Sequence, residues 1–226
     1  MVKAVIFDLD DTLISEYQYI ESGYSHVSQL LSNQFQEDSM EIKLILMELF
    51  HECPQNVFNR LYERLERTYT NEMITDLVQE YRNHDPVIAY YSDVLPCLLA
   101  LKNKGIKMGI ITNGYANAQK QKLRAVGRLE FFDEIILTDE IGSEYWKPHA
   151  KAYEMMKNRL KLDYGEMVYV GDNVSKDFVA PNKLGMKTVH IEREKGIYQG
   201  ADVSYGLEFQ AQYAIKSLWE LMALFE

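Results

Sequence analysis

The sequence predicts an α/β protein with two parts. The larger part is a doubly wound, Rossmann-like parallel sheet, because short runs rich in β-branched residues alternate with segments of helical periodicity. The smaller part is an inserted α-helical bundle, because the stretch 14–90 shows helical periodicity and contains only one of the chain's 12 glycines. A length of 226 residues fits one large domain plus such an insert.

The sheet domain is expected to alternate strands and helices. The strands are near-continuous apolar runs, which are typical of a parallel sheet covered by helices on both faces. Gly105 follows one expected helix in the position of a helix-ending glycine. The expected strands are 3–7, 107–112, 134–138, 167–170 and 187–191, and the expected helices are 93–104, 116–126, 149–160, 177–184 and a last one marked by Ala214, Leu218, Leu221 and Phe225.

The insert follows the first strand and is expected to contain four helices. A first helix covers 15–34 and a fourth covers 71–81, and two apolar stripes with helical spacing lie between them. Four amphipathic helices can bury their stripes against one another as a small bundle. The expected domains are therefore a sheet domain of 1–13 and 91–226 and a helical domain of 14–90.

Composition excludes several classes of protein. Lysine and arginine number 24 against 34 aspartates and glutamates, so a net charge of −10 repels polyanions such as nucleic acids. Cys53 and Cys97 lie far apart without metal-ligand spacing, which argues against a disulfide framework or a zinc site. The chain shows no membrane-length apolar run and no signal-like start. We therefore expect no nucleic-acid or membrane partner and a cytoplasmic location.

Polar residues follow three of the expected strands in a regular way. Ligands of open α/β sheets bind beyond the carboxyl ends of the strands, so these residues are expected to share one crevice. Asp8 and Asp10 lie on the same side of a strand end, and with Asp172 they supply the oxygen ligands that suit Mg²⁺. The three segments are Asp8-Leu9-Asp10-Asp11-Thr12, Thr112-Asn113-Gly114, and Gly171-Asp172 with Asp177.

Each piece also has an ordinary structural explanation. An Asp-x-Asp or a Gly-Asp after a strand is most often turn or helix-capping chemistry, and Asp177 could simply open the next helix. Lys147-Pro148 could be a solvated loop. In the first insert helix, Glu16, Tyr17 or Tyr19 could reach a substrate or could serve packing between helices. Only the shared order and position of the strand-end segments favour a functional site.

In this order, the segments resemble the motifs of the haloacid dehalogenase superfamily of hydrolases. That family has an Asp-x-Asp-x-Thr after the first strand, a Thr or Ser after a second strand, a Lys, and a Gly-Asp followed by another Asp. The resemblance covers essentially the whole chain, and the insert is similar to the four-helix, C1-type cap of the family's first subfamily. The matching residues are Asp8, Asp10, Thr12, Thr112, Lys147, Gly171, Asp172 and Asp177.

The resemblance implies a phosphatase that acts through an aspartyl-phosphate on Asp8. It makes Asp10 the general acid and base, and an acid at this position favours phosphate esters over halides, which leave without a proton. It assigns phosphate binding to Thr112, Asn113, Gly114 and Lys147, the middle two through their backbone amides. It assigns the Mg²⁺ cofactor to Asp8, Asp10 through its carbonyl, Asp172, and Asp177, which could act directly, through water or by orienting Lys147.

Two features depart from the family pattern. The loop 139–148 is longer between its glycine and Lys147 than usual, so the placement of Lys147 is the least determined of the motif positions. Pro181 lies where the family continues a helix, and a kink or a helix start is expected there.

The expected activity is hydrolysis of a small phosphate monoester, such as a sugar phosphate or a nucleoside monophosphate, by a monomer or a homodimer. The insert joins the sheet domain beside Asp8, which predicts a lid that excludes water and sets specificity. Alternatives are a phosphosugar mutase or another phosphotransferase of the superfamily, a phosphoacceptor signalling domain, and a non-catalytic binding module. In signalling receivers the lysine motif comes last, whereas here Asp172 follows Lys147.

Overall fold

The computed structural model describes residues 1–197 and 205–225, and the chain divides into two compact units. The core unit comprises Met1–Tyr17 and Ala89–Glu226, and the helical unit comprises Gln18–Ile88. The first boundary lies four residues later, and the second two residues earlier, than the sequence predicts. The first boundary moves because helix α1 (Glu16–Phe35) begins within the core unit.

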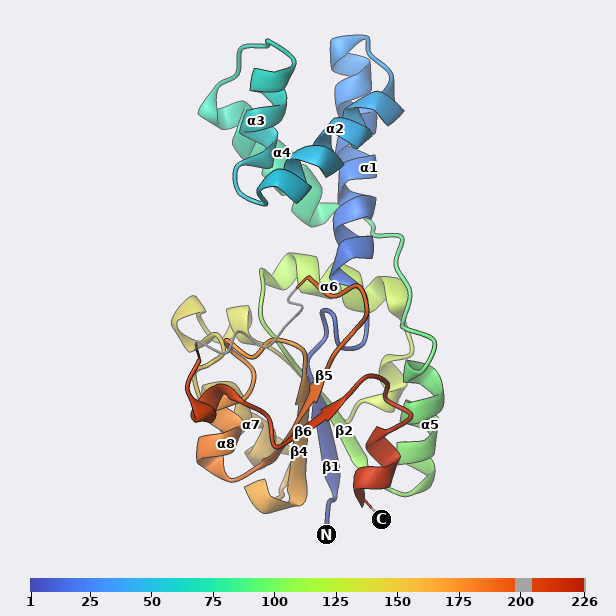
Figure 1. Ribbon diagram of the computed structural model, residues 1–226, viewed down its shortest axis with the longest axis vertical. Coiled ribbons are helices and arrows are strands. Elements are labelled where there is room, and N and C mark those ends of the chain that lie inside the picture. The colour runs from blue at the N-terminus through green and yellow to red at the C-terminus, as the bar shows by residue number, and fades with distance from the viewer. Residues whose placement is uncertain (198–204, 226) are drawn as a thin grey trace. The chain divides into compact units, whose positions relative to one another are not determined.

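A parallel sheet of six strands forms the centre of the core unit (Figure 1). The strand order is β3-β2-β1-β4-β5-β6, so the chain moves outward from β1 on one side and then continues on the other. Such a reversal places the ligand crevice at the carboxyl ends of the two central strands, β1 and β4. The strands are β1 (Ala4–Phe7), β2 (Lys107–Thr112), β3 (Glu134–Leu137), β4 (Met167–Gly171), β5 (Lys187–Ile191) and β6 (Tyr213–Ile215).

The predicted fold class is confirmed, and the five expected strands agree with β1 to β5 within one residue at each end. The expected last helix is wrong at its start, because Ala214 pairs with His190 as part of β6. A strand of three residues is too short to show an alternating pattern. Leu218 and Leu221 are buried, but only Leu221–Phe225 form a short 3₁₀ helix.

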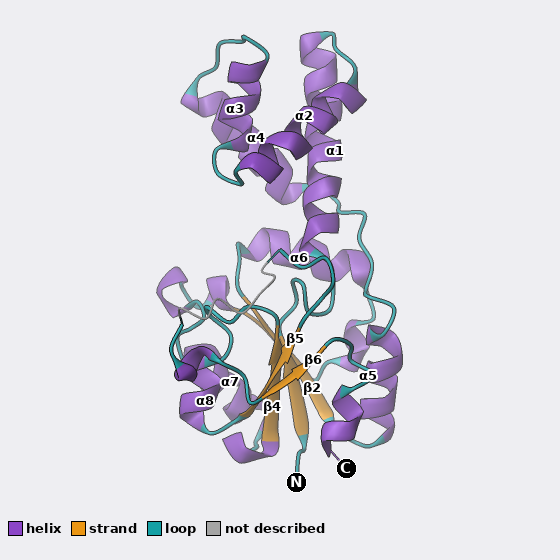
Figure 2. Ribbon diagram, in the orientation of Figure 1, coloured by secondary structure: helices purple, strands orange, loops and turns teal. Residues whose placement is uncertain are grey.

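Helices lie on both sides of the sheet (Figure 2). Tyr153 and Met156 of the seventh helix belong to one buried cluster with Ile6 and Tyr169. A Cβ at Gly109 would lie only 2.7 Å from Cε of Met156, so the Met156 side chain packs directly against the backbone of β2 at this position. The core helices are α5 (Val94–Asn103), α6 (Ala116–Val126), α7 (Lys151–Leu160) and α8 (Val179–Leu184), which contains Pro181 in its first turn.

The helical unit has its own hydrophobic core, to which all four helices contribute. Its only glycine, Gly23, lies against the ring of Tyr81, where an added Cβ would approach within 2.4 Å. Among the described residues, no helix combines the length and hydropathy that a membrane span requires. After α1 come α2 (Ser39–Glu52), α3 (Val57–Arg64) and α4 (Asn71–Asn83).

Two leucines of α2 provide a matched test of this core. Leu46 is fully buried, whereas Leu44 is 57% exposed. We expect Leu46→Ala to lower the free energy of unfolding by about 2–5 kcal/mol, because it leaves a cavity. Leu44→Ala should change it by less than about 0.5 kcal/mol. Urea unfolding followed by circular dichroism measures both, and equal losses would contradict the packing described.

Candidate active site

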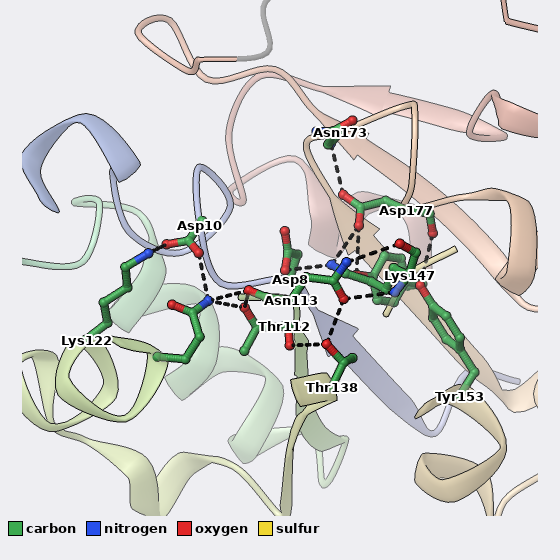
Figure 3. Close-up of polar contacts among 12 residues, drawn as sticks. Asp8, Asp10, Thr112, Asn113, Lys122, Thr138, Lys147, Tyr153, Asn173 and Asp177 are labelled. Carbon is green, nitrogen blue, oxygen red and sulfur yellow. Dashed lines mark hydrogen bonds and ion pairs between the residues drawn. The ribbon is translucent and has the colours of Figure 1, made fainter. Parts of the chain in front are cut away.

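The carboxyl ends of three strands deliver polar side chains to one place (Figure 3). Asp8 follows β1, Thr112 is the last residue of β2, and Asp172 follows β4. The backbone N–H of Asp8 extends the ladder by donating to the carbonyl of Val170 at 2.8 Å. Parallel pairing therefore brings together motifs that are far apart in the sequence.

Lys147 joins this group from the loop after β3. Its Nζ lies 2.7 Å from Oδ1 of Asp8 and 2.7 Å from Oδ1 of Asp177, and all three side chains are buried. It also donates to the hydroxyl of Tyr169 at 2.9 Å. A buried ammonium is costly unless it is paired and hydrogen-bonded, and here both conditions are met.

The longer loop before Lys147 is held in place by Asn113. The side-chain Oδ1 of Asn113 accepts from the backbone N–H of Lys147 at 2.9 Å, and Nδ2 donates to the Lys147 carbonyl at 3.1 Å. The Thr138 hydroxyl donates to the same Oδ1 at 2.9 Å. The Asn113 side chain thus positions Lys147, which leaves the backbone as the part of Asn113 that can meet a ligand.

Asp8, Asp172 and Asp177 form a buried group in which one oxygen of each carboxylate lies within 4.8 Å of the others. Burial, together with the neighbouring carboxylates, raises the pKa of Asp8 and raises that of Asp172 well above its usual range. Burial also acts on Asp177, but Lys147 and Lys176 outweigh it and hold the Asp177 pKa below its ordinary value. Around Asp172, the nearby positive charge therefore does not offset burial and the neighbouring carboxylates.

The same group fits a hard divalent cation. Oδ2 of Asp8 is buried without a hydrogen-bond partner in the described part of the chain. Such an orphaned oxygen beside a second buried carboxylate is a donor set for Mg²⁺, which binds oxygen ligands. Asp8, Asp172 and Asp177 are the residues that would hold it, although Asp177 already accepts from the backbone N–H of Asn173 at 2.9 Å.

The Asp10 carboxylate lies apart from this group and has partners of its own. Its Oδ1 accepts from Nζ of Lys122 at 2.7 Å, and its Oδ2 accepts from Nε2 of Gln119 at 2.8 Å. Burial alone would raise the pKa of Asp10, but Lys122 and Gln119 bring it below its ordinary value. The structure therefore does not gather the Asp10 side chain with the three carboxylates of the candidate metal site.

Thr112 lies at the carboxyl end of β2, which pairs with β1. It is buried, its Oγ1 accepts from Nε2 of Gln119 at 2.6 Å, and the next two residues lead into α6. Gly114 has a positive φ of 120°, a conformation that favours glycine. At this turn, Gly114 therefore presents backbone without a side chain near the end of β2.

Sequence reasoning missed three polar neighbours of the site. Gln119 and Lys122 contact Asp10. They lie one helical turn apart on the helix that follows the Thr112 strand, and this spacing indicates that both side chains can reach the same partner. Lys176 lies between Asp172 and Asp177 in the sequence. Burial lowers its pKa, but Asp8, Asp177 and Asp172 outweigh that effect and raise it.

The segments on either side of the helical unit are fastened to the core unit. Asp11 has a left-handed φ of 48°, and its carboxylate accepts from the backbone N–H of Glu16 at 3.0 Å and of Ile197 at 2.7 Å. Arg193 donates to the Thr12 carbonyl at 2.6 Å and to Asp93 at 2.7 Å. These contacts fix where α1 begins.

Of the three insert residues considered as substrate contacts, Tyr19 serves packing. It is 4% exposed, and its ring contacts Tyr81 and His84 within the helical unit. Glu16 instead belongs to the core unit, where burial and then Asp10 raise its pKa to about 7. The pKa of Glu16 is therefore affected by Asp10 of the candidate site.

A parallel sheet with an inserted helical unit, and with buried polar side chains at the ends of its central strands, fits the class of α/β proteins that bind their ligand beyond the carboxyl ends of the strands. The particular family follows from the sequence. The model of haloacid dehalogenase-like hydrolases matches residues 5–191, and the chain belongs to that family.

Curated relatives include phosphatases of similar length. A glyceraldehyde 3-phosphate phosphatase of Methanopyrus kandleri is 34% identical over 208 residues, which cover 86% of each chain. A pyrophosphatase PpaX of Bacillus pumilus is 28% identical over 196 residues, which cover 84% of this chain and 83% of the relative. Among solved structures, a phosphatase of the family from Thermococcus onnurineus has a TM-score of 0.64 and 28% identity, with 99% of this chain and 98% of that chain covered.

The raised pKa of Asp172 gives a test of the candidate metal site. Because the folded protein binds this proton more tightly than the unfolded chain, the stability that Asp172 contributes is present at low pH and is lost as pH rises through the raised pKa. In EDTA, we expect the melting temperature of wild type to fall relative to that of Asp172→Asn as pH rises, because only wild type loses this proton. Mg²⁺ should raise the melting temperature of wild type and not of the variant. A variant that is equally stabilised by Mg²⁺ would exclude Asp172 as a ligand.

Proposed function

We propose that the protein is a Mg²⁺-dependent phosphatase that hydrolyses a small phosphate monoester through an aspartyl-phosphate on Asp8. The observation that carries the proposal is the environment of Asp8. One carboxylate oxygen is paired with Lys147, and the other is buried without a hydrogen-bond partner among the described residues, beside Asp172. Lys147 thus orients one oxygen of Asp8, while the second oxygen is available to a metal ion or to the substrate.

In the first half of the reaction, an oxygen of Asp8 attacks phosphorus, and the bond from phosphorus to the ester oxygen breaks. Lys122 and Gln119 hold the pKa of Asp10 below its ordinary value, so Asp10 acts from its minor protonated form when it gives its proton to the leaving alkoxide. In the second half, a water molecule attacks the phosphorus of the aspartyl-phosphate and gives a proton to Asp10. The bond between phosphorus and Asp8 then breaks, which releases inorganic phosphate and restores both carboxyl groups.

The remaining residues hold the phosphoryl group. Lys147 and the Thr112 hydroxyl, with the backbone amides of Asn113 and Gly114, would bind its oxygens where charge accumulates. Mg²⁺, held by Asp8, Asp172 and Asp177, would supply further positive charge there when bound. Asp177 also orients the Lys147 ammonium, to which its Oδ1 lies 2.7 Å away.

We place glyceraldehyde 3-phosphate first among candidate substrates, because this is the substrate in the name of the Methanopyrus kandleri relative. Pyrophosphate, a phosphoanhydride whose leaving group is phosphate rather than an alkoxide, is the second candidate, from the name of the Bacillus pumilus relative. The net charge of −10 favours a small substrate over a polyanion. A cytoplasmic location, the lid role of the helical unit and the choice between monomer and homodimer stay predictions from the sequence.

Phosphate release tests the function directly. With Mg²⁺, we expect the protein to release inorganic phosphate from glyceraldehyde 3-phosphate faster than from pyrophosphate at equal concentrations. EDTA should abolish the release, and added Mg²⁺ should restore it. Ca²⁺ should support it poorly, because its coordination is larger and looser. Undiminished activity in metal-free buffer would contradict the metal requirement, and failure to release phosphate from either substrate or from an aryl phosphate would overturn the proposal.

Asp8→Asn tests the nucleophile. The amide is nearly isosteric but cannot form the aspartyl-phosphate, so we expect kcat to fall by at least about 10³-fold while the melting temperature stays close to wild type. Asp76→Asn on the exposed surface of α4 is the control for the same chemical change and should retain wild-type kcat. If Asp8→Asn sustained multiple turnovers near the wild-type rate, Asp8 could not be the nucleophile.

A further inference from the structure

Asp10 is held by two neighbouring side chains of α6. Gln119 and Lys122 lie one helical turn apart, and each contacts a different oxygen of the Asp10 carboxylate, at 2.8 and 2.7 Å. A carboxylate with both oxygens engaged by different donors can neither rotate nor shift freely. Its orientation is therefore set by α6 rather than by the turn after β1 that carries it.

Gln119 connects Asp10 to the phosphate-binding strand end. Its Nε2 also lies 2.6 Å from Oγ1 of Thr112 and 2.8 Å from the carbonyl of Asn113. An amide nitrogen carries two hydrogens, so three acceptors share them. The position of the Asp10 carboxylate is consequently coupled to that of the Thr112 hydroxyl through a single nitrogen.

The burial of Lys122 argues against its being an ordinary surface charge. Its side chain is 5% exposed, whereas Lys120 on the same helix is 45% exposed and pairs with Glu140 on the surface. Burying an ammonium costs free energy, and the ion pair with Asp10 offsets that cost only where the geometry is well defined. The buried ion pair thus contributes more to the position of the Asp10 carboxylate than to the stability of the fold.

We propose that Lys122 and Gln119 are positioning residues for proton transfer, which hold the Asp10 carboxylate in a fixed relation to Thr112 so that it faces the ester oxygen of the bound substrate. This inference rests on the proposed function, because it presumes that Asp10 protonates the leaving group. Misplacing an acid matters most when the leaving group needs the proton, so the effect depends on the ester.

The test compares an alkyl phosphate, glycerol 3-phosphate, with an aryl phosphate, 4-nitrophenyl phosphate, in the presence of Mg²⁺. We expect Lys122→Met to lower kcat for the alkyl ester by about 10- to 100-fold and for the aryl ester by less than about threefold. KM should stay near wild type for both esters. Lys122→Arg, which keeps the charge, should recover part of the loss, and Lys120→Met should leave both reactions unchanged.

A double-mutant cycle separates positioning from direct substrate binding. If Lys122 acts through Asp10, Asp10→Asn combined with Lys122→Met should be no slower than Asp10→Asn alone. A further loss in the double variant, or a rise in KM of equal size for both esters, would show that Lys122 binds the phosphoryl group itself and would overturn the inference. Should Lys122→Met fail to fold, Gln119→Leu carries the same test, with the same dependence on the leaving group expected.

The wild-type protein distinguishes the two levels of failure. If it releases phosphate from neither ester and from neither glyceraldehyde 3-phosphate nor pyrophosphate, the proposed function fails, and this inference fails with it. If it hydrolyses both esters and the alkyl and aryl reactions of Lys122→Met fall equally, the phosphatase proposal stands and only the positioning role is overturned.

Discussion

The buried ammonium of Lys147 is the interaction on which the site depends. It lies 2.7 Å from carboxylates that follow two different strands, Asp8 after β1 and Asp177 beyond β4. Without a cation between them, two buried carboxylates would repel each other and one would take up a proton. Lys147 therefore determines which oxygens of Asp8 and Asp177 are engaged, while Oδ2 of Asp8 is left without a hydrogen-bond partner among the described residues.

The two aspartates of the first strand end are kept in different environments. Asp8 faces Lys147 and the carboxylate of Asp172, whereas Asp10 faces Lys122 and Gln119 on α6. Environment, rather than residue type, is what assigns such neighbouring carboxyl groups to separate roles in catalysis. The proposed nucleophile and the proposed proton carrier thus follow the same strand without competing for one partner.

A second network fastens the chain where it leaves and rejoins the core unit. Arg193 donates to the carbonyl of Thr12 and to Asp93, and its guanidinium lies 4.1 Å from the ring centre of Tyr91. The hydroxyl of Tyr91 in turn donates to Asp11. The loop after β5 therefore ties together both segments that lead to the helical unit, close in sequence to the aspartates of the site.

The sequence by itself determined the alternation of strands and helices and the strand-end motifs, because burial and periodicity are local properties that each segment carries alone. It could not show β6, where three residues pair with β5. Nor could it show that the longer loop still places Lys147 in the site, since Asn113, just after β2, holds that loop. Nor could it assign Lys122 to Asp10. These contacts join residues that are brought together only by the packing of α6 and the sheet. No local sequence pattern predicts contacts between residues so far apart in the chain.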